Sequence, residues 1–205
     1  MIGKEILIIK SEAYCPYCEK FEDDVVSKYK GSIKIRTVMK KQLKGFKLKT
    51  DAFATPTIYF IKNGVEEYAN VGYLSPTEFY TVLGAFKLGK SSEGFRVAFN
   101  DGTDGSFCKQ YKIFKNTPDG VFVDKISGDV LFDTRDRFNS GTGWLSFYKA
   151  KEGSVIEKED NRFGMKRIEI IAKKSGIHLG HVFSMKNGKK RFCINATVLD
   201  FKKKK

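Results

Sequence analysis

The chain has 205 residues, enough for one large or two small domains, and its 41% hydrophobic content is ordinary for a globular protein. No apolar run approaches the ~18 residues that a membrane span needs. Residues 1–5 lack a basic segment followed by a long apolar stretch, so we expect no signal peptide and a cytoplasmic location. The net charge of +14 would suit nucleic acid, but no recognised nucleic-acid motif is present. We therefore expect a solvated, lysine-rich surface and neither a nucleic-acid nor a membrane partner.

Residues 1–88 carry alternating strand and helix signals. We expect strands at 6–9 and 33–37, separated by a helix over 15–30. Asn63-Gly64 joins two β-prone segments and predicts a hairpin of 57–61 with 65–71. Ser75-Pro76-Thr77-Glu78 combines a capping box with proline at the first helical position, which predicts a helix over 76–86. This order, a β-α-β unit followed by a hairpin and a last helix, indicates an α/β domain.

The composition changes at residues 84–94, where glycines and serines gather. We place the first domain at 1–88 and a linker at 89–95. Over 96–201 turn signals recur and strong helical periodicity is absent, which predicts a mainly antiparallel β domain. Residues 202–205, four lysines, are expected to form a basic tail. The expected fold class is therefore two domains, one α/β and one mainly antiparallel β.

Cys15-Pro16-Tyr17-Cys18 follows a predicted strand and opens a predicted helix. Helix-terminal N–H groups stabilise a Cys15 thiolate there, and Cys18, one turn further on, can close a disulfide with it. Half of a zinc site is the alternative, but zinc needs about four ligands, and no second close cysteine pair exists. Because the cytoplasm keeps thiols reduced, a close pair there is more often catalytic than structural. We interpret Cys15 and Cys18 as a redox centre.

Residues 4–87 resemble the thioredoxin superfamily. Ala54-Thr55-Pro56-Thr57 matches the cis-proline loop of that family, so the resemblance implies a cis Thr55-Pro56 bond against the cysteine pair. The Pro-Tyr centre of the cysteine motif is more typical of glutaredoxins, whereas the hairpin over 57–71 looks like thioredoxin. The electron donor therefore stays open between a thioredoxin reductase and another thiol donor.

Three segments of the second domain carry further chemistry: glycine-rich 140–147 around Trp144, His178-Leu179-Gly180-His181, and Arg191-Phe192-Cys193-Ile194-Asn195. In a strand, Arg191, Cys193 and Asn195 would share one face. A cysteine flanked on its own face by a cation and an amide is suited to thiolate chemistry. Each segment also has a structural explanation, as a core tryptophan, a structural or metal-binding histidine pair and a buried cysteine.

Together the three segments resemble the B-type methionine sulfoxide reductases, over about residues 96–201. The family pattern Ser-Gly-x-Gly-Trp-Pro-Ser-Phe is matched except that Leu145 replaces proline, and the histidine and cysteine patterns are matched at 178–183 and 191–195. The resemblance implies a thioredoxin-linked oxidoreductase that reduces methionine-R-sulfoxide, free or in proteins, to methionine. Met185 stands where the family tends to have an aspartate.

Many relatives carry two cysteine pairs for structural zinc. Residues 124–128 and 173–176 contain no cysteine. We therefore expect no zinc and no other cofactor, only a dithiol reductant.

The resemblance implies that Cys193 attacks the sulfoxide sulfur and is left as a sulfenic acid. His181, with His178 alongside, would deliver a proton to the sulfoxide oxygen. The other implied roles are support of the thiolate by Arg191, orientation of the site by Asn195, and packing of Trp144 against the S-methyl group of the substrate.

A sulfenic acid needs a second thiol to resolve it. Many B-type relatives place that thiol at the position held here by Thr142, and Cys108 is the only other cysteine of this domain. We expect Lys109 and Lys112 to help hold Cys108 as a thiolate. Cys15 would then open a Cys108–Cys193 disulfide by exchange. If Cys108 is a bystander, Cys15 reduces the sulfenic acid directly.

The turn before Cys193 decides whether His181 can act on it. A two-residue turn at Asn187-Gly188 would place Val182 opposite Cys193 and turn His181 toward the core. We therefore expect a three- or five-residue loop, or a bulge, which would pair His181 with Asn195 and bring it to the side of Cys193.

Two alternatives from other classes stay open. The first is a metal-dependent β-barrel oxygenase using His178, His181 and Cys193, which metal analysis would test. The second is a non-enzymatic basic protein that binds RNA or a membrane surface, which salt-dependent binding would test.

Overall fold

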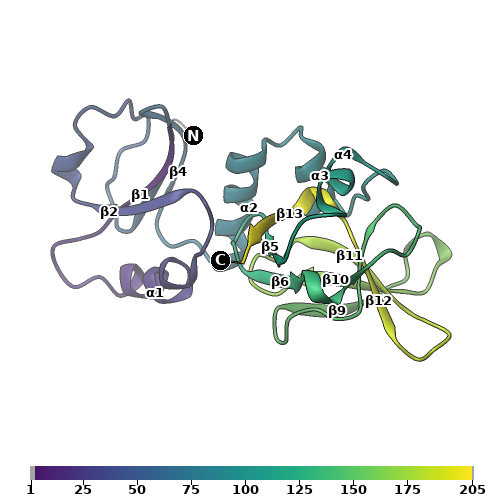
Figure 1. Ribbon diagram of the computed structural model, residues 1–205. Helices are drawn as coiled ribbons and strands as arrows, with labels where there is room; N and C mark the ends of the chain where they lie inside the picture. The colour runs from purple at the N-terminus through teal and green to yellow at the C-terminus, as the bar shows by residue number, and fades with distance from the viewer. Residues whose placement is uncertain (1–2, 205) are drawn as a thin grey trace. The chain divides into compact units, whose positions relative to one another are not determined.

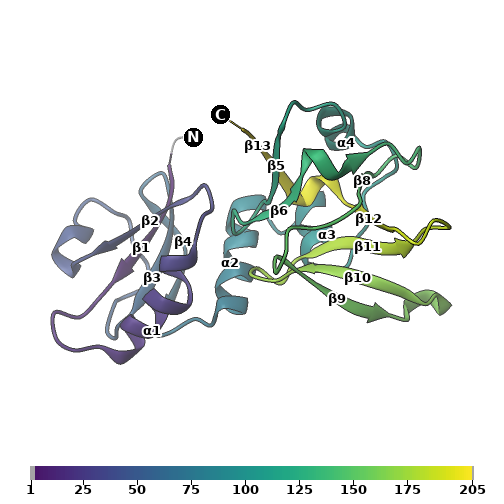
Figure 2. The ribbon, with the colours of Figure 1, turned by 60° about the horizontal axis from the view of Figure 1, so that its bottom comes forward.

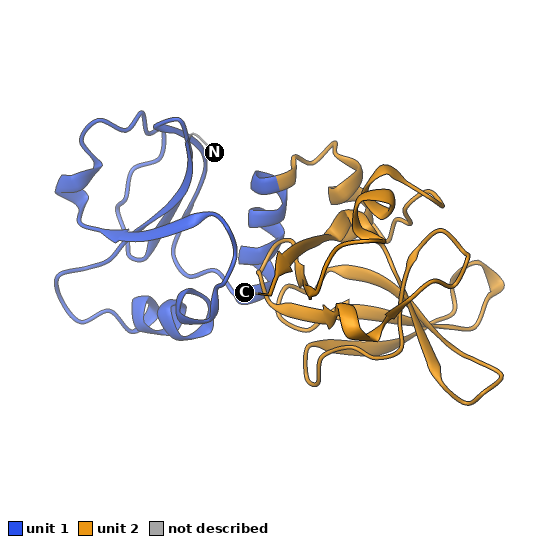
Figure 3. Ribbon diagram, in the orientation of Figure 1, with its two compact units in different colours: residues 1–87 blue, residues 88–205 orange. Residues whose placement is uncertain are grey.

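The structure is a computed structural model that describes residues 3–204. The chain divides into two compact units, residues 1–87 and 88–205 (Figure 3). The first is α/β and the second is mainly antiparallel β, so the predicted two-domain fold class is confirmed. In the described part of the chain, no helix is long and apolar enough to cross a membrane.

The first unit (Figure 1) is built on a four-stranded sheet of order β2-β1-β3-β4, in which β1 is parallel to β2 and antiparallel to β3; all four strands are labelled in Figure 2. Residues 6–9 of the inner strand β1 are at most 3% exposed, as their continuous apolar run predicts. The elements are β1 (Lys4–Ile9), α1 (Pro16–Asp24), η1 (Val26–Lys28), β2 (Lys34–Val38), η2 (Lys40–Leu43), β3 (Thr57–Lys62), β4 (Val65–Val71) and α2 (Pro76–Leu88).

Two local signals in this unit act as predicted. The β3–β4 hairpin turns through Asn63 and Gly64, whose φ angles of 52° and 77° suit a primed two-residue turn. The capping box before α2 is formed, because Ser75 N donates to Glu78 Oε2 at 2.9 Å and Glu78 N donates to Ser75 Oγ at 3.4 Å.

The second unit contains two antiparallel sheets, of order β7-β8-β12-β11-β10-β9 and β13-β5-β6 (Figures 1 and 2). The rings of Phe132 on β6 and Phe147 on β8 stack at 4.5 Å and are fully buried, so aromatic packing joins the sheets. The elements are α3 (Glu93–Phe99), α4 (Lys109–Phe114), β5 (Gly120–Asp124), β6 (Val130–Asp133), η3 (Thr134–Asp136), β7 (Arg137–Phe138), β8 (Leu145–Phe147), β9 (Val155–Asp160), η4 (Arg162–Gly164), β10 (Arg167–Ala172), β11 (His178–Ser184), β12 (Lys190–Ile194), η5 (Ala196–Val198) and β13 (Leu199–Lys203).

Several boundaries differ from those expected. The linker expected at 89–95 contains the start of α3, and α4 also lies where no helix was predicted, because helices of seven and six residues are too short to show a clear period. The basic tail expected at 202–205 is partly the end of β13, where Lys202 and Lys203 pair with β5. The helix expected over 15–30 ends earlier, because Val25 leaves the helical region with φ −125° and ψ −62°.

Candidate active site

The two cysteines of the first unit form a disulfide at the start of α1. Cys15 is the N-cap residue, and its Sγ accepts a hydrogen bond from Cys18 N at 3.2 Å. The Oγ1 of Thr55, which precedes the cis Pro56, lies 3.5 Å from the same sulfur, so the predicted placement of this loop is confirmed. Cys18 is 4% exposed, whereas Cys15 is half-buried. Cys15 is therefore the sulfur that an incoming thiol can reach.

Cys193 lies inside the six-stranded sheet, on β12 between β8 and β11. The register places Ser146 of β8 and His181 of β11 directly opposite it. Burial raises the pKa of the Cys193 thiol, although the nearby Arg191 guanidinium lowers it in part. At neutral pH the resting residue is therefore a thiol, and the thiolate forms only when its proton is removed.

The β11–β12 hairpin turns His181 toward Cys193. Met185 N donates to Lys189 O at 2.8 Å, which leaves a three-residue loop at 186–188. The predicted three-residue loop is therefore confirmed. The predicted partner Asn195 was wrong, because the loop is centred on Asn187, and this register pairs His181 with Cys193 itself. Pairing His181 with Asn195 would need a turn centred one residue later, on Gly188.

Asp160 fixes the protonation of His181. The Nε2 of His181 lies 2.8 Å from Asp160 Oδ2, and the same carboxylate accepts from Arg162 Nε and Arg167 Nη2, each at 2.7 Å. The Arg162 side chain leads the interactions that hold the pKa of Asp160 far below its usual range. A carboxylate can only accept, so Nε2 carries the imidazole proton and Nδ1 is left as a base. Burial lowers the pKa of His181, which keeps the ring neutral at pH 7.

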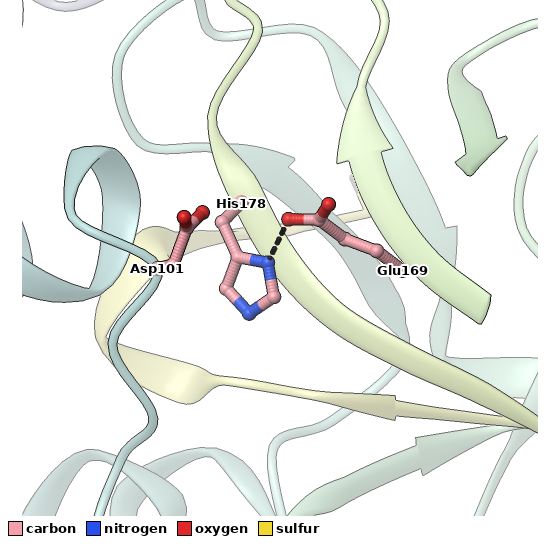
Figure 4. A group of neighbouring side chains, drawn as sticks. All are labelled: Asp101, Glu169 and His178. Carbon is pink, nitrogen blue, oxygen red and sulfur yellow. Dashed lines mark hydrogen bonds and ion pairs between the residues drawn. The ribbon is translucent and has the colours of Figure 1, made fainter. Parts of the chain in front are cut away.

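His178 occupies a different environment, although its ring centroid is 5.3 Å from that of His181. It is 3% exposed, and its Nδ1 lies 2.6 Å from Glu169 Oε1 (Figure 4). Glu169, His178 and Asp101 have ligand-type atoms within 4.8 Å of one another. The guanidinium of Arg162 contacts Asp101 and lies 3.7 Å from Glu169, so its positive charge offsets the negative charges of these two carboxylates. In the described part of the chain, His178, His181 and Cys193 therefore do not form the shared metal site that the oxygenase alternative requires.

Asn195 and Trp144 are held by one buried residue, Asp104. Asp104 N donates to Asn195 Oδ1 at 2.9 Å, and Trp144 Nε1 donates to Asp104 O at 3.1 Å. The Nδ2 of Asn195 donates to Leu179 O at 3.1 Å, so the amide is anchored at both ends. Asp104 and Asp160 were not predicted, because no spacing in the sequence links them to the residues that they hold.

These side chains surround a cavity of about 220 Å³, a size that suits one side chain. Arg191 lies over the ring of Phe183, 4.9 Å from its centroid, at the wall of this cavity. The lining residues are Thr103, Thr142, Trp144, Arg167, Gly180, His181, Phe183, Arg191, Cys193 and Asn195.

Comparison with known families accounts for both units. Residues 2–87 match a family model described as a thioredoxin-like domain, and residues 91–203, more than half of the chain, match one described as a SelR domain. The chain belongs to the SelR domain family. This is the family of the peptide-methionine (R)-S-oxide reductases, so the protein is an oxidoreductase, and the resemblance inferred from the sequence is confirmed for both units.

Cys108 of the SelR domain is the N-cap residue of α4 and is a free thiol. Its Sγ accepts from Tyr111 N at 3.4 Å and lies 3.8 Å from Asp104 Oδ2. Burial, together with the Asp104 carboxylate, raises the pKa of this thiol. The expected stabilisation of a thiolate by Lys109 and Lys112 was wrong, because both lysines are exposed to solvent.

The loop that carries Cys108 packs on the loop of Trp144. Ser106 Oγ donates to Thr142 O at 2.8 Å, and Phe107 N donates to Gly143 O at 2.9 Å. Because Thr142 lines the Cys193 cavity, these bonds tie the Cys108 loop to its rim. Gly143 has a φ of 86°, and a Cβ there would lie 2.7 Å from Phe107 N and overlap Ser106.

Gly143→Ala is therefore expected to lower the free energy of unfolding by about 2 kcal/mol or more, since a left-handed backbone penalty of about 1–2 kcal/mol adds to the clash. The matched control is Gly141→Ala, with a φ of 72° and nothing within 4 Å of the added Cβ, which should show the backbone penalty alone. Urea denaturation of both variants measures the difference. Equal losses would mean that the two loops move apart easily.

The two segments that hold zinc in many relatives meet in this structure around Asp124. The carboxyl group of Asp124 accepts from Ile126 N at 2.7 Å and Ser127 Oγ at 2.6 Å, and Ser175 also bonds to it. Burial raises the pKa of this carboxyl group. Hydroxyls and one carboxyl group, already bonded to one another, do not fit the thiolate-rich set of a structural zinc site.

Proposed function

We propose that this protein reduces methionine-R-sulfoxide, free or in proteins, through a sulfenic acid on Cys193. The observation that carries the proposal is the position of His181, directly opposite Cys193 and held at Nε2 by Asp160, in the cavity that Trp144 also lines. The bonded hydroxyls around Asp124 support a domain that works without zinc. The only co-reactant is a dithiol.

The proton for the first step comes from Cys193 itself. The thiol and the imidazole are both neutral at pH 7, because burial raises the pKa of Cys193 and lowers that of His181. When the sulfoxide binds, Nδ1 of His181 takes the thiol proton, and the thiolate attacks the sulfoxide sulfur. The imidazolium returns the proton to the oxygen, which transfers to Cys193. Methionine leaves, and the residue is a sulfenic acid.

The other side chains of the cavity hold the substrate and support the charge. Trp144, fixed by its bond to Asp104 O, offers a flat apolar wall to the S-methyl group. Arg191 partly offsets the effect of burial on the Cys193 thiol and favours its ionised form. His178 acts behind the site, where its bond to Glu169 steadies β11.

Recycling uses the remaining cysteines. Cys108 attacks the sulfenic sulfur, which forms a Cys108–Cys193 disulfide and releases water. The reduced Cys15–Cys18 pair then opens this disulfide by exchange and takes up its oxidised form, so two electrons pass from the dithiol to the sulfoxide. The exposure of Cys15 and the burial of Cys18 support Cys15 as the attacking thiol. A thioredoxin reductase or another thiol donor reduces the pair again.

The alternatives from other classes are less well supported. His178 and His181 are bound to different carboxylates, and the SelR match does not favour an oxygenase or a non-enzymatic basic binding protein. The proposal includes a cytoplasmic location and no nucleic-acid or membrane partner.

The experiment that tests this function is an assay of both sulfoxide epimers with the purified chain and dithiothreitol. Methionine should form from the R epimer and not from the S epimer. Turnover of the S epimer, or a need for added metal, would contradict the proposal.

Replacing His181 by Asn should lower kcat/KM for the R epimer by about 10²–10⁴-fold, the usual contribution of a general acid–base group. In the unmodified enzyme, activity should fall on acidification, at a pH below ~6.5, because His181 must be neutral and its pKa is lowered. The variant should lack this acidic limb. His178→Asn is the comparison and should lose much less activity; equal losses and equal pH profiles would remove His181 as the proton carrier.

A further inference from the structure

We propose that Asp104 is the base that activates Cys108 for attack on the Cys193 sulfenic acid. This inference rests on the proposed role of Cys108 as the resolving cysteine, and it adds a function for a buried acid that the first step does not use. Asp104 is 3% exposed and lies four residues before Cys108.

The contacts of the Asp104 carboxylate suit proton transfer from a thiol. Oδ2 lies 3.8 Å from Cys108 Sγ and accepts from Thr197 N at 3.1 Å, and Oδ1 accepts from Thr197 Oγ1 at 2.5 Å. Among the described residues, none of the ion pairs includes Asp104. The guanidinium of Arg96 bonds to Glu93 and to Thr103 O and interacts with Asp104 through its charge. Lys125 Nζ donates to Thr197 O at 2.8 Å. The Cys108 thiol is therefore a direct neighbour of a carboxylate that has no ion-pair partner among the described residues.

The main chain of Asp104 links this base to the catalytic strand. Its N–H bonds to Asn195, two residues after Cys193, and its carbonyl oxygen accepts from Trp144. A second cavity of about 420 Å³, lined in part by Phe107, Tyr111 and Trp144, lies beside the Cys108 loop and gives it room to move. These links use backbone atoms of Asp104, which a change of its side chain does not remove.

The step balances without an outside proton. Asp104 takes the S–H proton of Cys108, and the thiolate sulfur attacks the sulfur of the Cys193 sulfenic acid. The S–S bond forms as the S–O bond breaks. The leaving hydroxide accepts the proton that Asp104 holds and departs as water. Cys108 is oxidised, and the Cys193 sulfur is reduced from the sulfenic to the disulfide state.

The test uses the full chain with Cys15→Ser and Cys18→Ser, so that only Cys108 can resolve the sulfenic acid. One equivalent of methionine-R-sulfoxide is added without reductant, and samples are quenched and alkylated over time. Chromatography measures methionine, and mass spectrometry measures the Cys108–Cys193 disulfide. Asp104→Asn should form the disulfide at least ~10-fold more slowly than the parent at pH 7, with the rate counted from the methionine that each protein has already formed. Asp119→Asn, the same change at an exposed residue, is the matched control.

The sign of the effect separates a base from a merely electrostatic role. The Asp104 carboxylate raises the pKa of Cys108, so its loss would speed disulfide formation if it acted only by charge. For a base, the defect of Asp104→Asn should shrink as the pH rises from 7 to 10 and Cys108 ionises unaided. The titratable and charged groups next to the thiol are Asp104, the α4 residues Lys109, Tyr111 and Lys112, and Lys125, which bonds to Thr197 O. Asp104→Glu, which keeps a carboxylate, should recover part of the rate.

The outcomes distinguish the two levels of the proposal. Equal or faster disulfide formation in Asp104→Asn, or a defect that does not change with pH, would overturn the role of Asp104 alone. Methionine without any Cys108–Cys193 disulfide in the parent would overturn the role of Cys108 and that of Asp104 with it. No methionine in the parent would overturn the proposed function.

Discussion

Replacing Cys193 by Ser is expected to lower kcat for methionine-R-sulfoxide by several orders of magnitude. A serine hydroxyl is a far poorer nucleophile toward sulfur than a thiolate, even with His181 opposite residue 193 as a base. Loss of an essential nucleophile normally lowers kcat by several orders of magnitude. The measurement is methionine formation with dithiothreitol as reductant, so that the first unit is not needed.

The control for this prediction is Cys108→Ser, which should still convert one equivalent of sulfoxide in a single turnover. It also keeps turnover with dithiothreitol, because a small thiol can reduce a sulfenic acid directly. Activity of the Cys193→Ser variant above about a tenth of the parent would remove Cys193 as the nucleophile.

Cys15→Ser should block turnover driven by the natural electron source while leaving dithiothreitol-supported activity largely intact. Cys15 is the accessible sulfur of the Cys15–Cys18 disulfide, so its loss removes the thiol that attacks the oxidised SelR domain. The measurement compares the two reductants on one protein sample. A parallel loss with dithiothreitol would mean that the first unit stabilises the SelR domain instead of supplying electrons.

The fusion itself can be tested with two full-length variants that complement each other. A Cys15→Ser chain can reduce sulfoxide and a Cys193→Ser chain can supply electrons. Within one chain the two centres meet at an effective concentration of roughly millimolar, so at micromolar protein the mixture should recycle about 10²–10³-fold more slowly than the unmodified chain. An equally fast mixture would mean that the covalent link has no kinetic role.

Much of the fold and site could be predicted because the signals were local. The Asn63-Gly64 turn, the capping box at Ser75 and the cysteine motif at α1 each depend on residues within four positions of one another. The SelR segments were equally short. Short-range patterns of this kind depend on backbone geometry, which the rest of the chain does not alter.

The predictions that were wrong concerned features that contacts between residues distant in sequence decide. The helices α3 and α4 are too short to show a period, and β13 continues into the lysine run because β5 offers it a pairing edge. The prediction of a thiolate at Cys108 was wrong for the same reason. Burial and the Asp104 carboxylate, which folding brings close, raise the pKa of Cys108, whereas the exposed lysines nearby in sequence are screened by solvent.

The sequence by itself determined two redox units, and it predicts a reactive cysteine in each with particular residue types around it. Only the tertiary structure decided which atoms those residues use. A single residue in the β11–β12 loop sets whether His181 faces Cys193 or the core, because side chains alternate along a strand. Asp160 and Asp104, 21 and 91 positions from His181 and Asn195, fix the imidazole tautomer and the amide, and only folding brings such distant carboxylates and amides within hydrogen-bond range.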